Sequence, residues 1–538
     1  MPKKKQAFIM MVFTMFILVF SGLTLASSAD LDDPFVNLTW EDSPQTTQTI
    51  TWVVPKETEA YNLVYYGKYD GEWEKINDHE PESYTIDSQV FNTDNWIYSV
   101  KIENLNPDSD YLAQIKYEDD IVDEFMFSTL PESGELNFVV GADSRTDESE
   151  PRQERRKMRR KINSMVAREN PDFVVFGGDL IDNPDSDSHW NWWLEDWDEL
   201  MITEDNRRIP IVPAIGNHEV MGGYYGEKED AKFYYNYFNL PGNEKYYSLE
   251  LNEDVLLITL DSAHTTRIEE QEDWLEETLK NNYNEYETIL VQYHLAAWPS
   301  RRDFYQINFR RIREYWVPLF EEYDVDVVFE AHDHTFKLSE PITISEITDQ
   351  VRYDVNYAME KAEENFDVEK DYTPWGNPLL QKLSAGDWEQ AAAEEEPEIV
   401  DDLDTLDNAF REMVYHIALY QKQSENFTKR NILNETVESE LYPKFWDEKI
   451  DTLGRENLTN YEEGVLYIGD GGWGAPLRYP HDAEETWYLR RAVEVFNYFN
   501  VSIGPGGDKV NLEPVFIPNL LELEVSPEGV RYKPELWK

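Results

Sequence analysis

The chain has 538 residues, contains no cysteine and carries a formal net charge of −61. This length exceeds one ordinary domain core, so we expect two or more domains. The absence of cysteine excludes disulfides, thiolate metal ligands and a cysteine nucleophile. The large, dispersed excess of acidic residues excludes nucleic-acid binding through a basic surface.

The acidic charge also bears on the habitat of the protein. Concentrated salt shortens the reach of repulsion between surface charges to a few ångströms, so this composition indicates a halophilic or salt-exposed host. An acidic secreted protein from an ordinary habitat is the alternative. The sequence does not indicate an oligomeric state.

The N-terminus has the pattern of an export signal. Three lysines at residues 3–5 precede an apolar run from Ala7 to Ala26, and the small residues 27–29 follow. This order predicts a secretory signal peptide over residues 1–29, cleaved after Ala29. The apolar run is also long enough for an uncleaved membrane anchor. In both cases we expect the body of the protein to be secreted or held at the cell surface.

Residues 33–131 have the pattern of an all-β domain. Short alternating strands separated by turn residues predict a sandwich of about a hundred residues. The expected strands are Val36–Trp40, Thr49–Val54, Asn62–Tyr66, Trp96–Ile102, Tyr111–Tyr117 and Glu124–Ser128. No catalytic constellation is found among them.

A second domain is expected over residues 135–538, after a linker at 130–134. A helix at Arg152–Glu169 and alternating strand and helix patterns up to Phe329 favour a layered α/β fold. Five strand patterns each lead into polar residues. These are Leu136–Val140 before Asp143, Phe173–Phe176 before Asp179, the run from Pro213 before Asn217-His218-Glu219, Thr288–Tyr293 before His294, and Val325–Phe329 before His332 and His334.

Ligands bind at the carboxyl edge of open α/β sheets, where these polar residues are expected to meet. Carboxylate and amide oxygens together with imidazole nitrogens suit a pair of divalent metals such as Zn, Mn or Fe. The sequence therefore predicts a metal site at this edge.

The remaining third of the chain is less regular. Residues 337–461 are acidic and have apolar residues at helical intervals, which predicts a helical insertion. This insertion is either a solvated appendage or a lid over the site. A strand pattern resumes at residues 464–468, a Gly-rich turn follows at 469–477, and residues 520–533 are expected to form a hairpin that completes the sheet.

The five polar segments in this order resemble those of the calcineurin-like metallophosphoesterases, and within them the purple acid phosphatases. Residues Thr51-Trp52, Tyr65-Tyr66-Gly67, 105–111 and Phe127-Ser128-Thr129 are similar to the fibronectin-III-like N-terminal domain of that group. The Gly-rich turn at 469–477 is also similar to a family segment. The resemblance implies an all-β sandwich followed by a four-layer α/β metallophosphoesterase domain.

The resemblance also implies roles for individual residues. Asp179 would bridge two divalent or trivalent metal ions (Fe, Mn or Zn). The other implied ligands are Asp143 and His334 for the first metal, and Asn217, His294 and His332 for the second. His218 would stabilise the transition state or protonate the leaving alkoxide, and Glu219 would orient His218. Arg145 would hold a phosphate oxygen, or it is a surface arginine that balances Asp147 and Glu148.

The sequence departs from the family pattern at two places. Asp182 stands where purple acid phosphatases carry the tyrosine that binds ferric iron, so we expect no purple colour, and Asp182 is either a ligand or a neighbour of the first metal. The family's usual second histidine shortly after this motif is missing in the stretch that follows His294, so substrate contacts are expected from other residues. The candidates are Trp298, Arg301 and Arg302, and His264 is a further candidate for the border of the site.

Together with the export signal predicted at the N-terminus, the resemblance implies an exported phosphoesterase in which a metal-bound hydroxide attacks phosphorus directly. A phosphomonoesterase of the acid phosphatase kind, acting on a small-molecule phosphate ester, is favoured over a phosphodiesterase or nucleotidase of the same family. Two other classes of protein remain as alternatives. A surface protein that binds a polymer would still bind metal at a vestigial site but show no turnover, and a structural envelope protein would show neither metal binding nor turnover.

Overall fold

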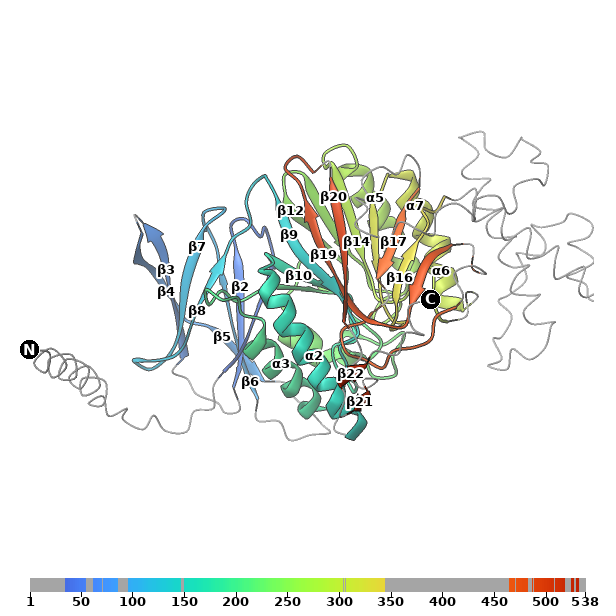
Figure 1. Cartoon of the computed structure of the whole chain (residues 1–538). Coiled ribbons are helices and arrows are strands. Elements are labelled where there is room, and N and C mark those ends of the chain that lie inside the picture. Colours follow the sequence, from blue (N-terminus) through green and yellow to red (C-terminus); the bar gives the residue numbers. More distant parts are fainter. Residues whose placement is uncertain are drawn as a thin grey trace, which may run out of the picture.

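The computed structural model describes residues 34–343, 464–517, 524–526 and 529–531, with short gaps at 55–60, 70, 86–94, 147–149, 303, 305, 470, 482–485, 487 and 508. A β-sandwich and a larger α/β domain lie next to each other (Figure 1). The predicted export signal and residues 344–461 of the predicted insertion lie outside the described residues. Within the described ranges, none of the helices combines the length and apolarity needed to cross a bilayer.

The N-terminal domain is a sandwich of two four-stranded sheets, with strand orders β1-β2-β6-β5 and β4-β3-β7-β8. All six predicted strands are confirmed within a few residues. Two further strands, β4 and β5, were not predicted, because the largely exposed, polar sequence of β4 lacks a continuous apolar face. The strands are β1 (Phe35–Thr39), β2 (Gln48–Val54), β3 (Tyr61–Tyr69), β4 (Glu72–His79), β5 (Glu82–Thr85), β6 (Trp96–Ile102), β7 (Asp110–Tyr117) and β8 (Asp120–Ser128).

One face of the first sheet is buried against the second domain. Along β2, Ile50 and Trp52 belong to the core between the two sheets of the sandwich, whereas Val53 belongs to the core of the second domain. This alternation follows from the period of two in a strand. Trp40 extends the same contact, with its ring centroid 5.7 Å from that of Phe173. The outer face of the first sheet therefore contributes to the core of the second domain, while the sandwich has a core of its own between its two sheets.

The second domain contains a five-stranded sheet, β11-β10-β9-β19-β20, and a seven-stranded sheet, β12-β13-β14-β15-β17-β16-β18. β9, β10 and β11 are parallel, and so are β13, β14, β15 and β17, so each sheet gathers several carboxyl ends at one edge. The strands are β9 (Leu136–Gly141), β10 (Phe173–Phe176), β11 (Ile211–Pro213), β12 (Tyr247–Asn252), β13 (Val255–Thr259), β14 (Thr288–Gln292), β15 (Val327–Glu330), β16 (Phe336–Ser339), β17 (Leu466–Gly469), β18 (Leu489–Val493), β19 (Phe496–Ile503) and β20 (Val510–Ile517).

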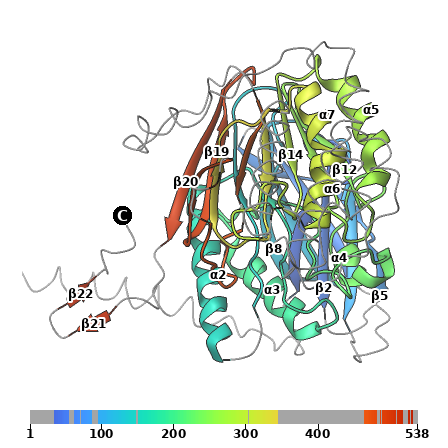
Figure 2. The same ribbon diagram turned by 90° about the vertical axis from the view of Figure 1, so that its right-hand side faces the viewer.

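Helices cover the outer faces of the two sheets, which gives the predicted four-layer fold (Figure 2). Leu256 of β13 packs under α5, α6 and α7, whereas its neighbour Leu257 packs between the sheets. On the five-stranded sheet, Phe176 makes edge contacts with Trp193 and Trp197 of α3. The helices are α2 (Glu150–Glu169), α3 (Asp187–Leu200), α4 (Lys232–Tyr237), α5 (Glu272–Asn282), α6 (Ile307–Tyr315) and α7 (Val317–Glu322), with the 3-10 turns η1 (Lys228–Ala231) and η2 (Glu269–Gln271).

Two expectations about the C-terminal third need correction. Residues 337–339 are not part of an insertion, because they belong to β16, which pairs with β17 and β18. The tail does form a hairpin, of β21 (Glu524–Ser526) and β22 (Gly529–Arg531), but it is a separate two-stranded sheet. The strands that complete the five-stranded sheet are β19 and β20, which were not predicted.

Candidate metal centre

The polar residues that follow the strands meet at one edge of the two sheets. Two groups of side chains have ligand atoms within 4.8 Å of one another: one contains Asp179, His294 and His332, and the other contains Asp143, Asp179 and His334. All five residues are buried. Asp179 belongs to both groups, so the structure brings together one shared carboxylate and two sets of partners.

Four of these five residues have a strained backbone. Asp143, Asp179, His332 and His334 have φ angles of 59°, 55°, 79° and 57°, in the left-handed region that non-glycine residues rarely adopt. Such strain persists only where the surrounding structure enforces it, and it concentrates at functional sites. The turns also explain how His332 and His334, two residues apart, reach different groups.

His294 is the centre of one group. Its Nε2 atom lies 3.2 Å from Asp179 Oδ1, from Asn217 Oδ1 and from His332 Nδ1. With metal bonds of about 2.1 Å, neighbouring ligand atoms in octahedral or tetrahedral sites are about 3.0–3.4 Å apart. The His294 Nδ1 atom lies 2.7 Å from the carbonyl oxygen of Gly177, to which it can donate its proton. Nε2 is then left as a free ligand atom.

Asp143 and His334 form the other side of the centre. His334 Nε2 lies 3.1 Å from Asp143 Oδ1, and His334 Nδ1 lies 2.6 Å from the carbonyl oxygen of Pro476. Asp143 Oδ2 accepts a hydrogen bond of 2.9 Å from the backbone N–H of His332. Asp143 Oδ1 is buried and has no hydrogen-bond donor among the described residues, which is the state expected of a ligand atom.

The electrostatics of the centre favour added positive charge. Burial opposes a charge on His294, yet Asp179 and Asp143 raise the pKa of His294 to about 9. Burial likewise works against ionised Asp179, but His294 and His218 hold the pKa of this carboxyl well below its usual range. Burial and the nearby charge of Arg302 lower the pKa of His332, which leaves it neutral, as a ligand must be. The donors present therefore fit a pair of metal cations.

Two glycines allow the loops of the centre to approach one another. A Cβ atom at Gly471, where φ is +78°, would lie 1.7 Å from Asp143 Oδ2. A Cβ atom at Gly216 would lie 2.5 Å from Asp179 Oδ1. Both distances are far below any allowed contact, so these positions require glycine for the carboxylates to keep their places.

Glu219 has a different place from the one we expected. Its carboxylate accepts hydrogen bonds from the backbone N–H groups of Asp179, Leu180 and Gly216 at 2.8–2.9 Å. The expectation that Glu219 orients His218 is therefore wrong, because the Glu219 carboxylate instead ties together the loops after β10 and β11. Burial and the charge of Asp179 raise the pKa of Glu219 to about 8.

His218 and Arg145 lie on the solvent side of the shared carboxylate. His218 Nε2 is 3.9 Å from Asp179 Oδ2, and His218 Nδ1 lies 2.8 Å from the carbonyl oxygen of Asp182. Arg145 Nη1 pairs with Asp182 Oδ1 at 2.6 Å, and Arg145 Nε is 3.6 Å from Asp179 Oδ2. Asp182 belongs to neither ligand group, since its carboxylate positions Arg145. The Arg145 side chain is 13% exposed, and the partners named in its alternative role, residues 147 and 148, lie outside the described residues.

The remaining candidates are divided by burial. Trp298 is fully buried in the core under the helices, so it cannot contact substrate as we expected. His264 is also buried; its ring centroid is 5.4 Å from that of His294, and its Nδ1 and Nε2 atoms lie next to Gly223 O and Ser262 Oγ. His264 therefore packs against His294 on the buried side of the centre.

Asp333 is a functional candidate that the sequence reasoning missed. Its buried carboxylate accepts hydrogen bonds from the backbone N–H groups of Arg301, at 2.7 Å, and Arg302, at 3.3 Å. Arg302 Nε lies 3.3 Å from Asp333 Oδ1. The feature of the sequence that could have identified Asp333 is its position between His332 and His334. Asp333 thus fixes a loop that carries two of the candidate arginines.

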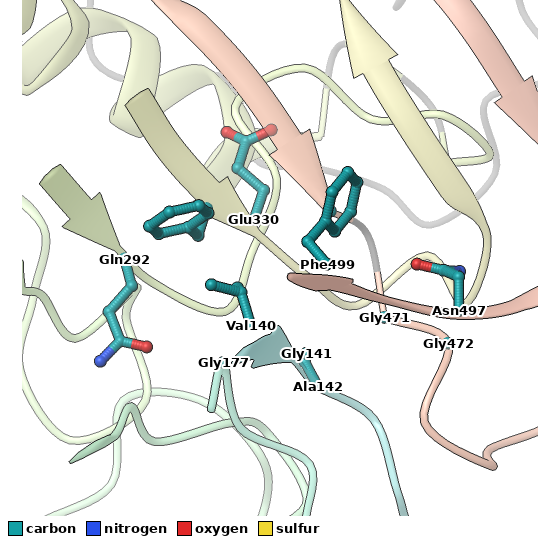
Figure 3. A pocket seen from close by; sticks show the side chains of 12 residues that line it. Val140, Gly141, Ala142, Gly177, Gln292, Glu330, Gly471, Gly472, Asn497 and Phe499 are labelled. Carbon is teal, nitrogen blue, oxygen red and sulfur yellow. The ribbon is translucent and has the colours of Figure 1, made fainter. Parts of the chain in front are cut away.

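A small pocket lies beneath the centre, between the two sheets (Figure 3). Its lining includes the polar side chains of Gln292, Glu330 and Asn497, together with backbone at Gly177 and Gly471. None of the candidate metal ligands lines it. It is therefore a gap in the packing behind the metal centre, left where glycines bring the loops together, and not the place for a substrate.

Comparison with known proteins follows the same division of the chain. Residues 34–129 match the family model of the purple acid phosphatase N-terminal domain, and residues 152–336 match that of the calcineurin-like phosphoesterases. The structure of a purple acid phosphatase from yellow lupin (Lupinus luteus) seeds is similar in fold, with a TM-score of 0.54 and 13% sequence identity; the match covers 90% of this chain and 72% of the lupin chain.

Curated relatives match at low identity. An uncharacterized protein of Mycobacterium tuberculosis (strain CDC 1551 / Oshkosh) is 26% identical over 47% of this chain and 52% of its own length. Purple acid phosphatase 21 of Arabidopsis thaliana is 27% identical over 52% of this chain and 61% of its own length. The purple acid phosphatase of Glycine max is 26% identical over 32% of this chain and 38% of its own length. The chain thus spans about half the length of the curated relatives that it matches.

Proposed function

The chain belongs to the purple acid phosphatase-like metallophosphoesterases, a family of metal-dependent phosphoester hydrolases with a dinuclear centre, and we propose that it is an exported phosphomonoesterase. One observation carries the proposal. Asp179 is shared between two buried groups of carboxylate and imidazole ligands. A shared carboxylate holds two cations close enough to clamp both the attacking and the leaving oxygen of a phosphoryl displacement.

The protein would hold one ion with Asp143, Asp179 and His334, and the other with Asp179, Asn217, His294 and His332. When bound, such a pair of Fe, Mn or Zn ions supplies Lewis acidity and lowers the pKa of water. The reaction consumes one water: its oxygen forms a new bond to phosphorus, the bond from phosphorus to the ester oxygen breaks, and the leaving alkoxide receives a proton. Inorganic phosphate and an alcohol result.

His218 is the group placed to supply that proton. Its Nδ1–H can donate to the carbonyl oxygen of Asp182, and this contact keeps Nε2 turned toward Asp179. The doubly protonated imidazolium can release the Nε2 proton and remain in the same orientation as the neutral ring.

Arg145 is the group placed to hold a phosphoryl oxygen. Arg145 Nη1 is fixed by Asp182, while Nε is buried without a hydrogen-bond acceptor among the described residues. A phosphoryl oxygen at the centre would satisfy this donor.

The proposal is tested with the purified full-length chain, loaded with Mn or Zn, on 4-nitrophenyl phosphate and on bis(4-nitrophenyl) phosphate. We expect hydrolysis of the monoester to exceed that of the diester. Asp179→Asn and His294→Ala should each reduce turnover about 10³-fold or more, because each removes part of the metal clamp. Asp273→Asn, on the exposed side of α5, makes the same change of charge as Asp179→Asn and should leave turnover unchanged.

Metal analysis of the same samples separates the other classes of protein. A binding protein with a vestigial site would still bind metal but show no turnover, and a structural protein would show neither metal nor turnover. Turnover that survives both substitutions at the centre would refute the proposed site.

Export is a separate part of the proposal and is supported by the basic, apolar and small-residue pattern of residues 1–29. Adaptation of the protein to concentrated salt is a further part of the proposal and is supported by the net charge of −61. The N-terminal sequence of protein recovered from the native host should begin at Asp30 if the signal is cleaved. A mature chain that begins at Met1 would indicate an uncleaved anchor.

A further inference from the structure

A buried ion pair joins the strands on either side of the turn that carries His332 and His334. Glu330 is the last residue of β15, two residues before His332, and Lys337 lies in β16, three residues after His334. Lys337 Nζ pairs with Glu330 Oε2, and both side chains are completely buried. Two charges withdrawn from water are unfavourable unless their geometry and further hydrogen bonds compensate. Neither residue belongs to a ligand group of the metal centre.

The Glu330 carboxylate binds the chain on both sides of His294. Its Oε1 atom accepts a hydrogen bond of 2.6 Å from the hydroxyl group of Tyr293, the residue before His294. The same oxygen accepts a hydrogen bond of 2.6 Å from the backbone N–H of Ala297, three residues after His294. Because Glu330 stands two residues before His332, one carboxylate oxygen ties the turn of His294 to the strand that leads to His332.

Two buried cations hold the rest of the His294 turn. Lys337 Nζ donates a hydrogen bond of 2.9 Å to the carbonyl oxygen of Trp298. Arg313 of α6 is also buried and donates to the carbonyl oxygen of Ala297. Both backbone groups of Ala297 and the carbonyl group of Trp298 are therefore bonded to charged side chains. A shift of the turn would leave a charge buried without its partner, which is strongly unfavourable inside a protein.

The ligand distances at the centre give this arrangement a purpose. His294 Nε2 lies 3.2 Å from Asp179 Oδ1 and from His332 Nδ1. The ligand atoms of a metal site must keep such separations to within about 0.5 Å. Buried ion pairs can often be replaced by apolar residues without loss of stability, but apolar residues cannot bond the backbone of a turn. The contacts of Glu330 and Lys337 therefore serve the position of the turn more than the stability of the fold.

We propose that Glu330 and Lys337 are positioning residues of the metal centre, and that their ion pair sets the place of His294 relative to His332. The inference rests on the proposed function, in which these two histidines hold one of the two metal ions. The pair acts through the backbone of the His294 turn and through Tyr293. Its loss should therefore weaken the binding of that ion more than it weakens the fold.

The double variant Glu330→Gln with Lys337→Met tests the proposal on the full-length chain. It removes both charges together, so that neither is left buried alone, and it keeps the lengths of the two side chains. In urea with excess chelator, the unfolding midpoint should shift by less than about 0.5 M. The affinity for one of two Zn ions should fall about 10- to 100-fold, measured by competition with a chelator and elemental analysis. The other ion, held by Asp143 and His334, should be retained.

Asp198→Asn with Arg208→Met is the matched control. These two residues form another ion pair, with 2.5 Å between Arg208 Nη1 and Asp198 Oδ1, and their side chains are 8% and 20% exposed. Arg208 precedes β11 and so lies at the end of that strand away from the metal centre. The control loses one charge of each sign, as the test variant does, and should keep both Zn affinities of the unaltered protein.

Tyr293→Phe is a milder second variant. It deletes only the hydroxyl group that donates to Glu330 and keeps the buried ring. Loss of this one hydrogen bond should weaken the binding of the same Zn ion about 3- to 10-fold. This variant tests the proposal even if the double variant does not fold.

Several results would overturn the positioning role. Unaltered affinity for both Zn ions in the double variant would do so, and so would an equal fall in the control. Loss of both ions together would also overturn it, because the pair would then support the centre as a whole and not the place of His294. A large shift of the unfolding midpoint, with Tyr293→Phe binding Zn like the unaltered protein, would show that the pair serves folding alone.

Zinc affinity does not depend on turnover, so the result is separate from the test of the proposed function. Selective loss of one ion from a protein that hydrolyses no ester would support the positioning role and reject the phosphoesterase. Hydrolysis of esters by a protein whose Zn affinities do not respond to the pair would support the phosphoesterase and reject the positioning role.

Discussion

Gly471→Ala is the smallest change that should disable the metal centre from outside its ligand set. The added methyl group would lie 1.7 Å from Oδ2 and 2.4 Å from Cγ of Asp143, so the carboxylate or the Gly-rich turn must move by more than an ångström. Movement of Asp143 breaks the 2.9 Å hydrogen bond from the N–H of His332 and the 3.1 Å contact with His334.

The loss of folding stability caused by Gly471→Ala has two contributions. A non-glycine residue in the left-handed region costs about 1–2 kcal/mol, and the loss of a hydrogen bond to a charged carboxylate costs about 1.5–3 kcal/mol. We therefore expect Gly471→Ala to lower the free energy of unfolding by about 3–5 kcal/mol. Metal binding should weaken at least about 10- to 100-fold, because the position of a ligand is lost.

Gly506→Ala provides the matched control. Gly506 has a φ of +85°, close to the +78° of Gly471, but a Cβ atom there would meet nothing within 4 Å. The free energy of unfolding of the Gly506→Ala variant should fall only by the cost of the left-handed backbone, about 1–2 kcal/mol, and its metal content should not change. Both free energies are measured by denaturant unfolding, and metal content is measured by elemental analysis of the purified proteins. Equal unfolding free energies and equal metal content in the two variants would refute the reasoning.

Two other predictions follow from buried charges. Metal binding should release protons and become stronger as the pH rises toward about 9. Against the effect of burial, Asp179 and Asp143 raise the pKa of His294 to about 9, and a metal ion must displace the proton that His294 then carries. Calorimetry in buffers of different ionisation enthalpy measures the proton release, and a metal affinity independent of pH between 6 and 9 would contradict the prediction. Asp196→Ala should lower the free energy of unfolding by about 3–5 kcal/mol without changing metal content, because it leaves Arg159 buried without its carboxylate partner. Glu199→Ala removes an exposed carboxylate that pairs with Arg160, and should lower the free energy of unfolding by less than about 1 kcal/mol. Denaturant unfolding measures both values, and equal losses of stability would contradict the prediction.

Local sequence was sufficient for the strands that have a clear apolar pattern and for most of the candidate site. The four hydrophobic residues of Phe173–Phe176 form β10 as predicted, because a strand buried on both faces is apolar at every position. The polar residues after β9, β10, β14 and β15 were predicted to meet because parallel strands present their carboxyl ends at one edge. The two ligand groups around Asp179 agree with that expectation.

Contacts between distant segments decided the rest. Glu219 has the sequence context of a partner for its neighbour His218, but its carboxylate accepts hydrogen bonds from backbone on two different loops. The sequence left open whether Asp182 is a metal ligand or a neighbour of the metal, and the fold pairs its carboxylate with Arg145. The strand β19 pairs with β9 across more than 350 residues of sequence, and no local pattern encodes such a partner.

Residue type and spacing thus determined which side chains could bind metal, since a carboxylate, an amide or an imidazole after a buried strand has the same chemistry in any fold. Tertiary structure alone decided which oxygen faces which nitrogen, which arginine keeps an unused donor and which glycine lies against Asp143. These properties depend on distances of 2–4 Å between loops far apart in the chain, and such distances are set only when the two sheets pack against each other.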